Sequence, residues 1–300
     1  MKKTYFFFGI LWWILQQPSV AQISALRQKI SQIVAQPKAT VGVSIWGPNA
    51  QDTLSFHGND HLPMQSVFKF HIALAVLAQV DKGKFRLDQP ITIQPKDLLP
   101  KLYSPLREKY PKGATLPLSE ILTYAVSQSD NVGCDVLLRL LGGSKVVEQY
   151  FVNQHFTDIS IKINEETMQN NWDLQYQNWT TPNAANRLLM AYYTNKPQRL
   201  SKSSHAFIWN IMKGTTTGLH RLREHLPKGT VIAHKTGTSG TNTAGLSAAT
   251  NDIGLIFLPD GRPVYVSVFV SDSHENEATN EKIIADIGKA IWEHFTGKSR

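Results

Sequence analysis

The chain has 300 residues, of which 42% are hydrophobic and 18% charged, a composition that is typical of a globular protein and excludes a disordered tail or a fibre. Its 31 basic and 23 acidic residues give a net charge of +8, but Lys and Arg form no run of five or six, so we expect no nucleic-acid partner. The single cysteine, Cys134, cannot form an internal disulfide, and an exported chain would depend on its core alone.

The first 21 residues are predicted to be a cleaved signal peptide. Lys2 and Lys3 form a positive segment, Tyr5 to Leu15 form a mostly apolar one, and Ser19-Val20-Ala21 is a small-residue cleavage site. The apolar stretch is too short for a stable anchor, and no later segment reaches about 18 apolar residues. We therefore expect a monomeric, periplasmic protein without a membrane anchor, whose mature chain begins near Gln22.

The remaining elements are expected in the order helix and strands, helices, strands and helix. Helical periodicity at 23–34 precedes strands at 40–46 and 53–57. Helices are expected at 66–80, 118–128, 132–141, from a cap at Ser144, from Thr181-Pro182, and at 206–213. Strands follow at 230–234, 245–249, 253–258 and 264–270, and a last amphipathic helix at 277–295.

This order predicts an α+β fold with one antiparallel sheet that is built from both ends of the chain. We expect a sheet domain from residues 22–62 and 214–300, with an all-α domain, residues 63–213, inserted between them. A cleft between the two domains is the expected site.

Ser66-Val67-Phe68-Lys69 places a hydroxyl and an amine three residues apart on a predicted helix. Residues at this spacing share a helix face, so the amine can reach the hydroxyl and, with a pKa lowered by burial, can take its proton. Such a pair occurs by chance on many helix surfaces, but the helix around Ser66 is almost wholly apolar. A buried Ser–Lys pair therefore favours catalysis.

Two further triplets point the same way. Ser129-Asp130-Asn131 separates two predicted helices, where a polar cap is expected in any case, and Lys235-Thr236-Gly237 follows an apolar strand. The three motifs in this order are the known signature of class A β-lactamases and penicillin-binding proteins.

On these motifs the chain resembles class A serine β-lactamases over its whole mature length, and especially their PER/VEB-like extended-spectrum branch. The resemblance implies that Ser66 is the acylated nucleophile, Lys69 its activating partner and Ser129 the relay of a proton to the leaving β-lactam nitrogen. It implies an oxyanion hole from the backbone N–H groups of Ser66 and Thr238. Substrate-binding residues would be Asn131, Lys235, Thr236, Gly237, Thr238, Ser239, Arg221 and, at the cleft mouth, Tyr103.

Deacylation in that family requires a loop glutamate in a Glu-x-x-Leu-Asn pattern. The loop here reads Glu165-Glu166-Thr167-Met168-Gln169. Glu165 is the preferred base, since Met168 then takes the apolar position; Glu166 is the alternative, with Gln169 in the apolar position.

The chain also departs from the family pattern. The positions of the Arg–Asp ion pair that closes the neck of this loop hold Ile163 and Asn178, and a usual asparagine is Asp135. These changes, with Gln169, suit the PER/VEB-like branch and put the usual loop conformation in doubt.

The ten histidines form no ligand cluster, and His220 and His225 have no obvious carboxylate partner, so we expect no metal. Phosphate-binding glycine loops are absent, and no cofactor is expected. The alternatives are a penicillin-sensing receptor domain and a D-Ala-D-Ala peptidase, both of which acylate without efficient deacylation.

Overall fold

The computed structural model describes residues 19–297, so most of the predicted signal peptide, residues 1–18, lies outside the described residues. A five-stranded antiparallel sheet joins the two ends of the chain. Its strand order is β2 (Thr53–Phe56), β1 (Thr40–Trp46), β10 (Pro263–Ser273), β9 (Ser247–Phe257) and β8 (Ile232–Thr238). The α+β fold expected from the sequence is confirmed.

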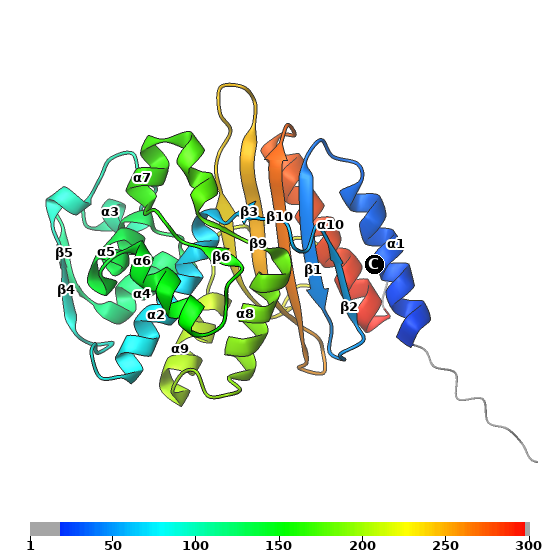
Figure 1. The fold of residues 1–300 in the computed structure, drawn as a ribbon, viewed down its shortest axis with the longest axis horizontal. Coiled ribbons are helices and arrows are strands. Elements are labelled where there is room, and N and C mark those ends of the chain that lie inside the picture. Colours follow the sequence, from blue (N-terminus) through cyan, green and yellow to red (C-terminus); the bar gives the residue numbers. More distant parts are fainter. Residues whose placement is uncertain (1–18, 298–300) are drawn as a thin grey trace, which may run out of the picture.

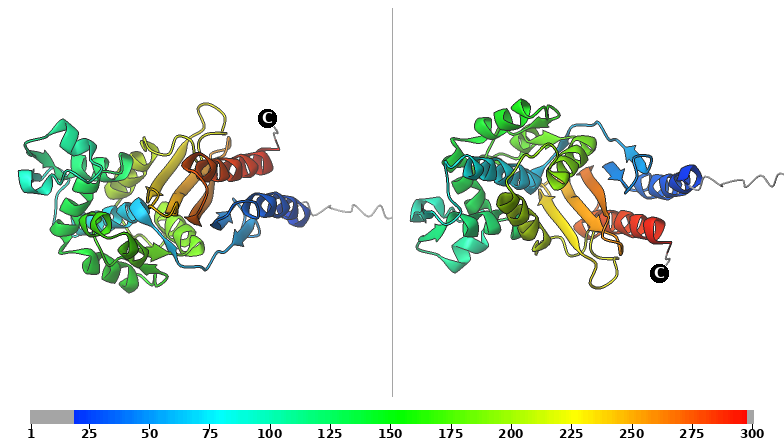
Figure 2. Two further views of the ribbon diagram at one scale, coloured as in Figure 1. Left: turned by 90° about the horizontal axis from the view of Figure 1, so that it is seen from above. Right: turned by 90° about the horizontal axis from the view of Figure 1, so that it is seen from below.

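Helices cover both faces of this sheet, because successive side chains of each strand point to opposite sides. Val266 and Val268 belong to the cluster that packs against α1 (Ser19–Val34) and α10 (Glu277–Thr296). Phe269 belongs to the cluster on the opposite face. Figure 1 shows α1 and α10 together on one side of the sheet and the remaining helices on the other, and Figure 2 shows the same layers from above and below.

The helical layer is organised around α2 (Phe68–Asp81), whose side chains are buried on almost every side. Four helices pack directly on it: α4 (Leu118–Ser127), α5 (Asn131–Leu141), α6 (Ser144–Asn153) and α9 (Lys202–Lys213). Further out lie α3 (Pro105–Lys109), the 3-10 turn η2 (Pro95–Asp97) and the β4–β5 pair (Pro90–Ile93, Ala114–Pro117). The helix α8 (Pro182–Thr194) packs on β1, β9 and β10 and so lies against the sheet.

A long loop between α6 and α8 forms one wall of the molecule. It holds α7 (Glu165–Asn170) and the 3-10 segment η3 (Trp172–Gln177). Its two ends, β6 (Ile159–Ser160) and β7 (Trp179–Thr180), pair with each other, and β7 also pairs with β3 (Leu62–Pro63).

Three expectations need correction. The strands expected at 245–249 and 253–258 are one strand, β9, because the polar residues between them are buried and hydrogen-bonded rather than in a loop. Ser144 is not a cap: it lies inside α6, and its Oγ donates to the carbonyl of Lys162. Ser66 lies in the 3-10 turn η1 (Gln65–Val67) just before α2, a common beginning for a helix.

Candidate active site

Ser66 and Lys69 meet at the N-terminal end of α2. In a 3-10 turn residues i and i+3 eclipse each other, so the step from η1 into α2 still places both side chains together. Lys69 is fully buried, and its Nζ donates to Ser66 Oγ at 2.5 Å and to Asn131 Oδ1 at 2.7 Å. The same Nζ lies 2.5 Å from Glu165 Oε1. Three groups of the predicted site therefore converge on one buried amine.

The turn that carries Ser66 is held tightly against β8 and β9. Gln65 has a φ of +47°, a strained value for a residue with a side chain. Asn251 Nδ2 donates to the carbonyls of Pro63 and Met64, at 2.8 and 3.1 Å, and so fixes the turn from β9. A Cβ at Gly237 would lie 2.5 Å from the Met64 carbonyl oxygen, so only glycine lets β8 pass this close to the nucleophile.

Ser129 and Asp130 form a rigid turn at the start of α5. Ser129 has a φ of +58°. The carboxylate of Asp130 accepts from Gly133 N at 2.7 Å, Leu106 N at 2.7 Å and Ser104 Oγ at 2.8 Å, so it caps α5 and ties it to α3. Burial raises the pKa of Asp130. The cap expected on general grounds is thus present, and it holds Ser129 and Asn131 on either side of it.

Lys235 joins this group from β8. It is fully buried, and its Nζ donates to Ser129 Oγ at 2.9 Å and to the Thr236 carbonyl at 2.9 Å. Burial and the positive charge of Lys69 hold the pKa of Lys235 well below its usual range, while the charges of Glu165 and Asp252 oppose this shift.

Arg221 borders the cleft beside Thr238. Its Nη1 donates to the carbonyls of Gly237 and Asn251, at 3.1 and 2.9 Å. Its Nη2 donates to Thr238 Oγ1 at 2.7 Å, and its Nε to Glu281 Oε1 at 3.0 Å. The guanidinium is buried and bonded to Thr238, which is exposed in the cleft. Its positive charge therefore acts on the cleft through the Thr238 hydroxyl.

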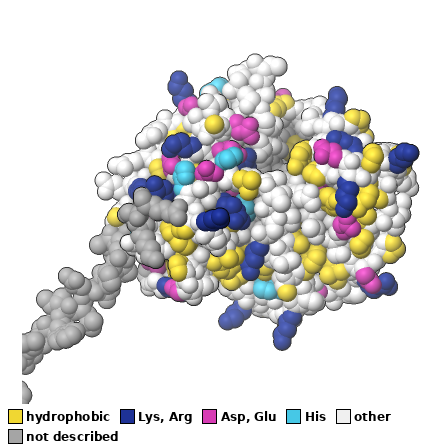
Figure 3. Space-filling model, turned by 180° about the vertical axis from the view of Figure 1, so that it is seen from behind, with side chains coloured by type: hydrophobic (Ala, Val, Ile, Leu, Met, Phe, Trp, Pro, Cys, Tyr) yellow, Lys and Arg dark blue, Asp and Glu magenta, His cyan; other side chains and the backbone are white. Residues whose placement is uncertain are grey.

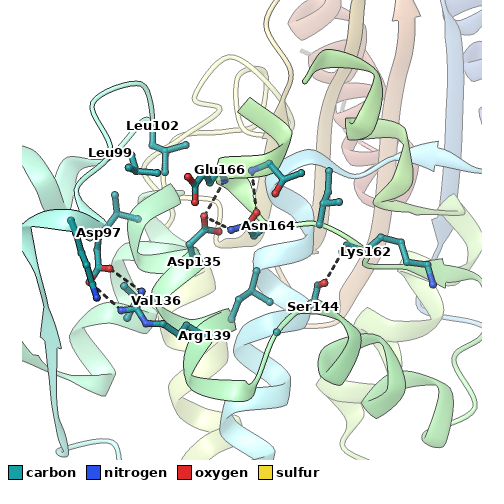
Figure 4. Close-up of a pocket in the computed structure, with 16 residues that line it drawn as sticks. Asp97, Leu99, Leu102, Asp135, Val136, Arg139, Ser144, Lys162, Asn164 and Glu166 are labelled. Atoms are coloured by element: carbon teal, nitrogen blue, oxygen red, sulfur yellow. Dashed lines mark hydrogen bonds and ion pairs between the residues drawn. The ribbon is translucent and has the colours of Figure 1, made fainter. Parts of the chain in front are cut away.

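The two adjacent glutamates have opposite surroundings. Glu165 is 5% exposed and its Oε1 lies 3.4 Å from Ser66 Oγ, whereas Glu166 is exposed and lines a separate pocket behind α7 (Figure 4). Asn164 caps α7 by accepting from Thr167 N at 3.0 Å, which fixes the direction of both side chains.

Asp135 supports the beginning of α7 from α5. Its Oδ1 accepts from Glu165 N at 2.8 Å, and its Oδ2 accepts from Glu166 N at 3.0 Å and from Asn164 Nδ2 at 3.1 Å (Figure 4). Burial, followed by the negative charge of Glu165, raises the pKa of Asp135 to about 7, although the two backbone N–H groups act in the opposite direction.

At the positions of Ile163 and Asn178, the neck of the loop is closed by hydrogen bonds rather than by an ion pair. Asn178 is fully buried; its Oδ1 accepts from Lys162 N at 2.8 Å and Ile163 N at 3.1 Å, and its Nδ2 donates to the Ile163 carbonyl at 2.9 Å. The neutral amide of Asn178 thus holds the two ends of the loop together by hydrogen bonds to backbone, where an Arg–Asp pair would do so by charge.

These groups border a cleft of about 630 Å³ between the sheet and the helical layer. Its wall includes Tyr103, 54% exposed at the mouth, and Ser239, whose hydroxyl is engaged by Gly240 O and Ala249 N. Lys69 and Lys235 are fully buried behind the residues that line the cleft. The predicted residues that line it directly are Ser66, Tyr103, Ser129, Asn131, Glu165, Arg221, Thr236, Gly237, Thr238 and Ser239.

Sequence reasoning missed several residues around this cleft. Asn251, Asp252 and Glu281 bond the residues that surround the cleft, and Gln65 lines it, yet none belongs to a recognised motif. The available signal was the run Thr250-Asn251-Asp252, three polar residues inside an apolar strand pattern. Buried polar residues in a strand need partners, and these partners lie at the site.

The histidines have partners that were not expected. His220 Nδ1 lies 2.8 Å from Glu224 Oε2, and His225 Nε2 lies 3.6 Å from Asp286 Oδ1, so the expectation that they lack carboxylates was wrong. Within residues 19–297, no group of three or more His, Cys, Asp or Glu side chains is arranged to hold a metal ion. Cys134 is buried, and burial raises its pKa well above the ordinary thiol value.

Known proteins share this architecture. A sequence model of the β-lactamase enzyme family matches residues 25–295. The chain is 52% identical over 280 residues to β-lactamase VEB-1 of Pseudomonas aeruginosa, covering 93% of each chain. It is 43% identical to extended-spectrum β-lactamase PER-1 of the same organism, covering 91% of this chain and 88% of the relative. A solved β-lactamase from Chitinophaga pinensis has a TM-score of 0.88 at 50% identity, covering 91% of this chain and all of that one.

Proposed function

The chain belongs to the β-lactamase enzyme family and hydrolyses the β-lactam amide bond, and we propose that it does so through an acyl-enzyme on Ser66. The observation that carries this proposal is the convergence of Ser66, Glu165 and Asn131 on the buried amine of Lys69. A buried, hydrogen-bonded Ser–Lys pair facing a cleft has the geometry of an activated nucleophile.

Acylation begins with proton transfer around Lys69. The 2.5 Å contact between Lys69 Nζ and Glu165 Oε1 allows the carboxylate to take a proton from the ammonium group. The neutral amine then accepts the Ser66 proton as Oγ attacks the β-lactam carbonyl carbon. The backbone N–H groups of Ser66 and Thr238 stabilise the oxyanion, a contribution of about 10²–10³ in rate for one such donor.

Ring opening requires a proton on the β-lactam nitrogen. Ser129 delivers it, with its hydroxyl oriented by the hydrogen bond from Lys235 Nζ at 2.9 Å, and regains a proton from the ammonium of Lys69, which holds the proton taken from Ser66. Lys69 then takes back the proton held by Glu165, so that Glu165 is a carboxylate again before deacylation. Lys235, with Thr236 and Thr238, binds the substrate carboxylate, and Arg221 adds its charge through Thr238. Asn131 binds the amide of the substrate's acyl side chain. Deacylation then uses Glu165 as the base that activates a water molecule on the ester carbonyl.

A penicillin-sensing receptor or a D-Ala-D-Ala peptidase would share the acylation machinery. The position of Glu165, 3.4 Å from Ser66 Oγ, favours a hydrolase over both, because those proteins acylate without an efficient deacylating base.

We extend the proposal to bulky oxyimino-cephalosporins. The relatives PER-1 and TLA-1 are described as extended-spectrum enzymes, and the second has a TM-score of 0.88 to this chain at 46% identity. The neutral neck at Asn178 and the Thr238-Ser239 pair at the end of β8 are consistent with this breadth. We also propose export to the periplasm and a monomeric state, which sedimentation of the purified protein would check.

The test is turnover of a chromogenic cephalosporin and of a ceftazidime-like compound by the purified mature chain. Ser66→Ala should lower turnover by about 10⁶, as loss of a covalent nucleophile does. Mass spectrometry with a slow substrate should place the adduct on the peptide that contains Ser66. An adduct on another peptide would refute the mechanism, and background rates on the oxyimino compound beside brisk penicillin turnover would refute the breadth.

A further inference from the structure

Lys235 and Arg221 are the two cations proposed to bind the substrate carboxylate. The residue next to each of them in the chain is bonded to the same buried side chain, Asp252. Asp252 lies on β9 and is fully buried. Its Oδ1 and Oδ2 lie 2.9 and 3.0 Å from His234 Nδ1, and its Oδ2 also accepts from Leu222 N at 3.3 Å. His234 precedes Lys235, and Leu222 follows Arg221.

We propose that Asp252 is a positioning residue for recognition of the substrate carboxylate. It ties the segment carrying Arg221 to the strand carrying Lys235, so that both cations keep one fixed separation. The inference rests on the proposed roles of Arg221 and Lys235 and adds the group that holds them together.

The segment around Arg221 needs such a tether because it is a turn between α9 and β8 rather than a regular element. The guanidinium makes its contacts to Gly237, Asn251 and Thr238 only while the backbone stays at one distance from β8 and β9. On the other side the segment lies against α10, where a Cβ at Gly288 would come within 2.8 Å of the Leu222 carbonyl oxygen. On the sheet side, Asp252 bonds the backbone of the segment directly, at Leu222 N.

The β8 side of the tether is equally constrained. His234 is fully buried, and its Nε2 has no hydrogen-bond partner among the described residues, so the contact with Asp252 is what orients the ring. A Cβ at Gly254, opposite His234 on β9, would lie 2.7 Å from His234 Cβ. His234, directly before Lys235, is therefore held at its backbone and Cβ by Gly254 and at its imidazole by Asp252.

The charge of Asp252 also bears on Lys235. The charged groups that act on this ammonium are Lys69 and Arg221, which favour its neutral form, and Glu165 and Asp252, which favour its charged form. Removing the Asp252 charge should therefore let Lys235 lose its proton at lower pH.

Three variants separate these effects. Asp252→Ala removes the tether and the charge, and Asp252→Asn removes the charge but keeps one oxygen that can accept from both donors, as Oδ2 does now. Asp286→Asn is the matched control, since it neutralises a carboxylate on α10 that contacts Lys282 and His225 and lies outside the catalytic and binding groups. The measurements are kcat/KM for benzylpenicillin from pH 5 to 10 and the single-turnover deacylation rate of a slow cephalosporin.

We expect Asp252→Ala to lower kcat/KM about 10- to 100-fold while deacylation changes less than about threefold, because Glu165 and α7 are untouched. Asp252→Asn should recover most of kcat/KM at pH 7 but move the alkaline limb of the profile to lower pH. Asp286→Asn should match the wild type. Equal losses in both rates, or no loss in either, would overturn the inference.

If Asp252→Ala does not fold, His234→Ala decides, because it removes the β8 side of the tether and leaves Asp252 in place. A kcat/KM equal to that of the wild type in His234→Ala refutes the positioning role. Arg221→Ala and Lys235→Ala test the underlying assignment separately. If those two variants keep normal kcat/KM, the proposed carboxylate site is wrong. If they lose it while the Asp252 variants do not, only the role of Asp252 is wrong.

Discussion

Two adjacent acidic residues with different surroundings allow a test at the residue scale. Glu165 is buried beside Ser66, and Glu166 faces the pocket behind α7. Glu165→Gln should still acylate at Ser66, although more slowly because Lys69 loses the carboxylate that takes its proton. Release of product should slow far more, giving a burst of about one equivalent and then a nearly flat line. Stopped-flow turnover of a chromogenic cephalosporin measures this.

The neighbouring residue supplies the control. Glu166→Gln should keep most of its turnover, since its carboxylate points away from the ester. If Glu166→Gln traps the adduct and Glu165→Gln does not, the deacylating base has been misassigned by one residue. If neither variant traps it, a loop glutamate is not the base.

Asp135 gives a pH dependence with a defined sign. Its pKa is raised from 3.8 to about 7 in the folded chain, so the folded state binds a proton more tightly than the unfolded state does. Its contribution to stability is therefore greatest at acid pH and is lost as pH rises from about 4 to about 7. Asp135→Asn removes this titration, so the stability of the variant relative to the wild type should improve between pH 5 and pH 8, by on the order of 2 kcal/mol.

Urea unfolding of both proteins at pH 5, 6, 7 and 8 measures this difference in the free energy of unfolding. Titrating groups that the variant leaves unchanged contribute equally to both proteins and so cancel from the difference. Parallel pH profiles for the two proteins would mean that Asp135 titrates at its ordinary value in the folded chain.

At the element scale, Asn178 holds the two ends of the long loop together through three hydrogen bonds to backbone. Asn178→Ala leaves these buried groups without partners, and we expect a loss of about 2–3 kcal/mol in the free energy of unfolding. Deacylation should slow more than acylation, because Glu165 is on the loop and Lys69 is not. Asn170→Ala, at the exposed end of α7, is the control and should change neither quantity.

The elements differ in how far local sequence determines them. The strand expected at 40–46 and the helix expected at 132–141 agree with β1 and α5 to within a residue, because clear periodicity and a glycine stop define them. The two-residue strands β3, β6 and β7 were missed, since their pairing depends on tertiary contact and has no local pattern. The break expected in β9 was wrong for a related reason: polar residues read locally as a loop, and only the folded site supplies their partners.

The site follows the same division. Ser66, Lys69, Ser129 and Lys235 belong to motifs and could be named from the sequence. Asn251, Asp252 and Glu281 act through contacts with residues 18 to 188 positions away, such as His234 and Pro63, so no spacing rule could find them.

At the scale of the whole molecule, charge and apolar surface are dispersed. Figure 3 shows Lys and Arg side chains on one face as separate protrusions with acidic neighbours among them. Two of the large exposed apolar side chains, Val146 and Val152, share α6, whereas Tyr103, Met190, Leu219 and Val231 lie in separate parts of the chain.

The packing of α1 and α10 on one face of the sheet limits how far the chain can be shortened at its N-terminal end. The described ends of the chain lie side by side in α1 and α10, where Leu26 and Ile30 are 2% and 0% exposed and Lys29 Nζ lies 2.5 Å from Glu293 Oε2 (Figure 1). A chain that begins at Gln22 keeps all of these contacts, so it should unfold at the same temperature as the processed protein.

A chain that begins at Gln32 lacks Leu26 and Ile30 and exposes the facing side of α10 and the sheet. Loss of each buried side chain costs about 2–5 kcal/mol, a large part of the stability of an ordinary domain, so this shorter chain should be largely unfolded and inactive at 37 °C. Circular dichroism melts and nitrocefin turnover of the two truncated chains measure the difference. Equal melting temperatures would mean that α1 contributes nothing to the core, and that the sheet is stable with its outer face half covered.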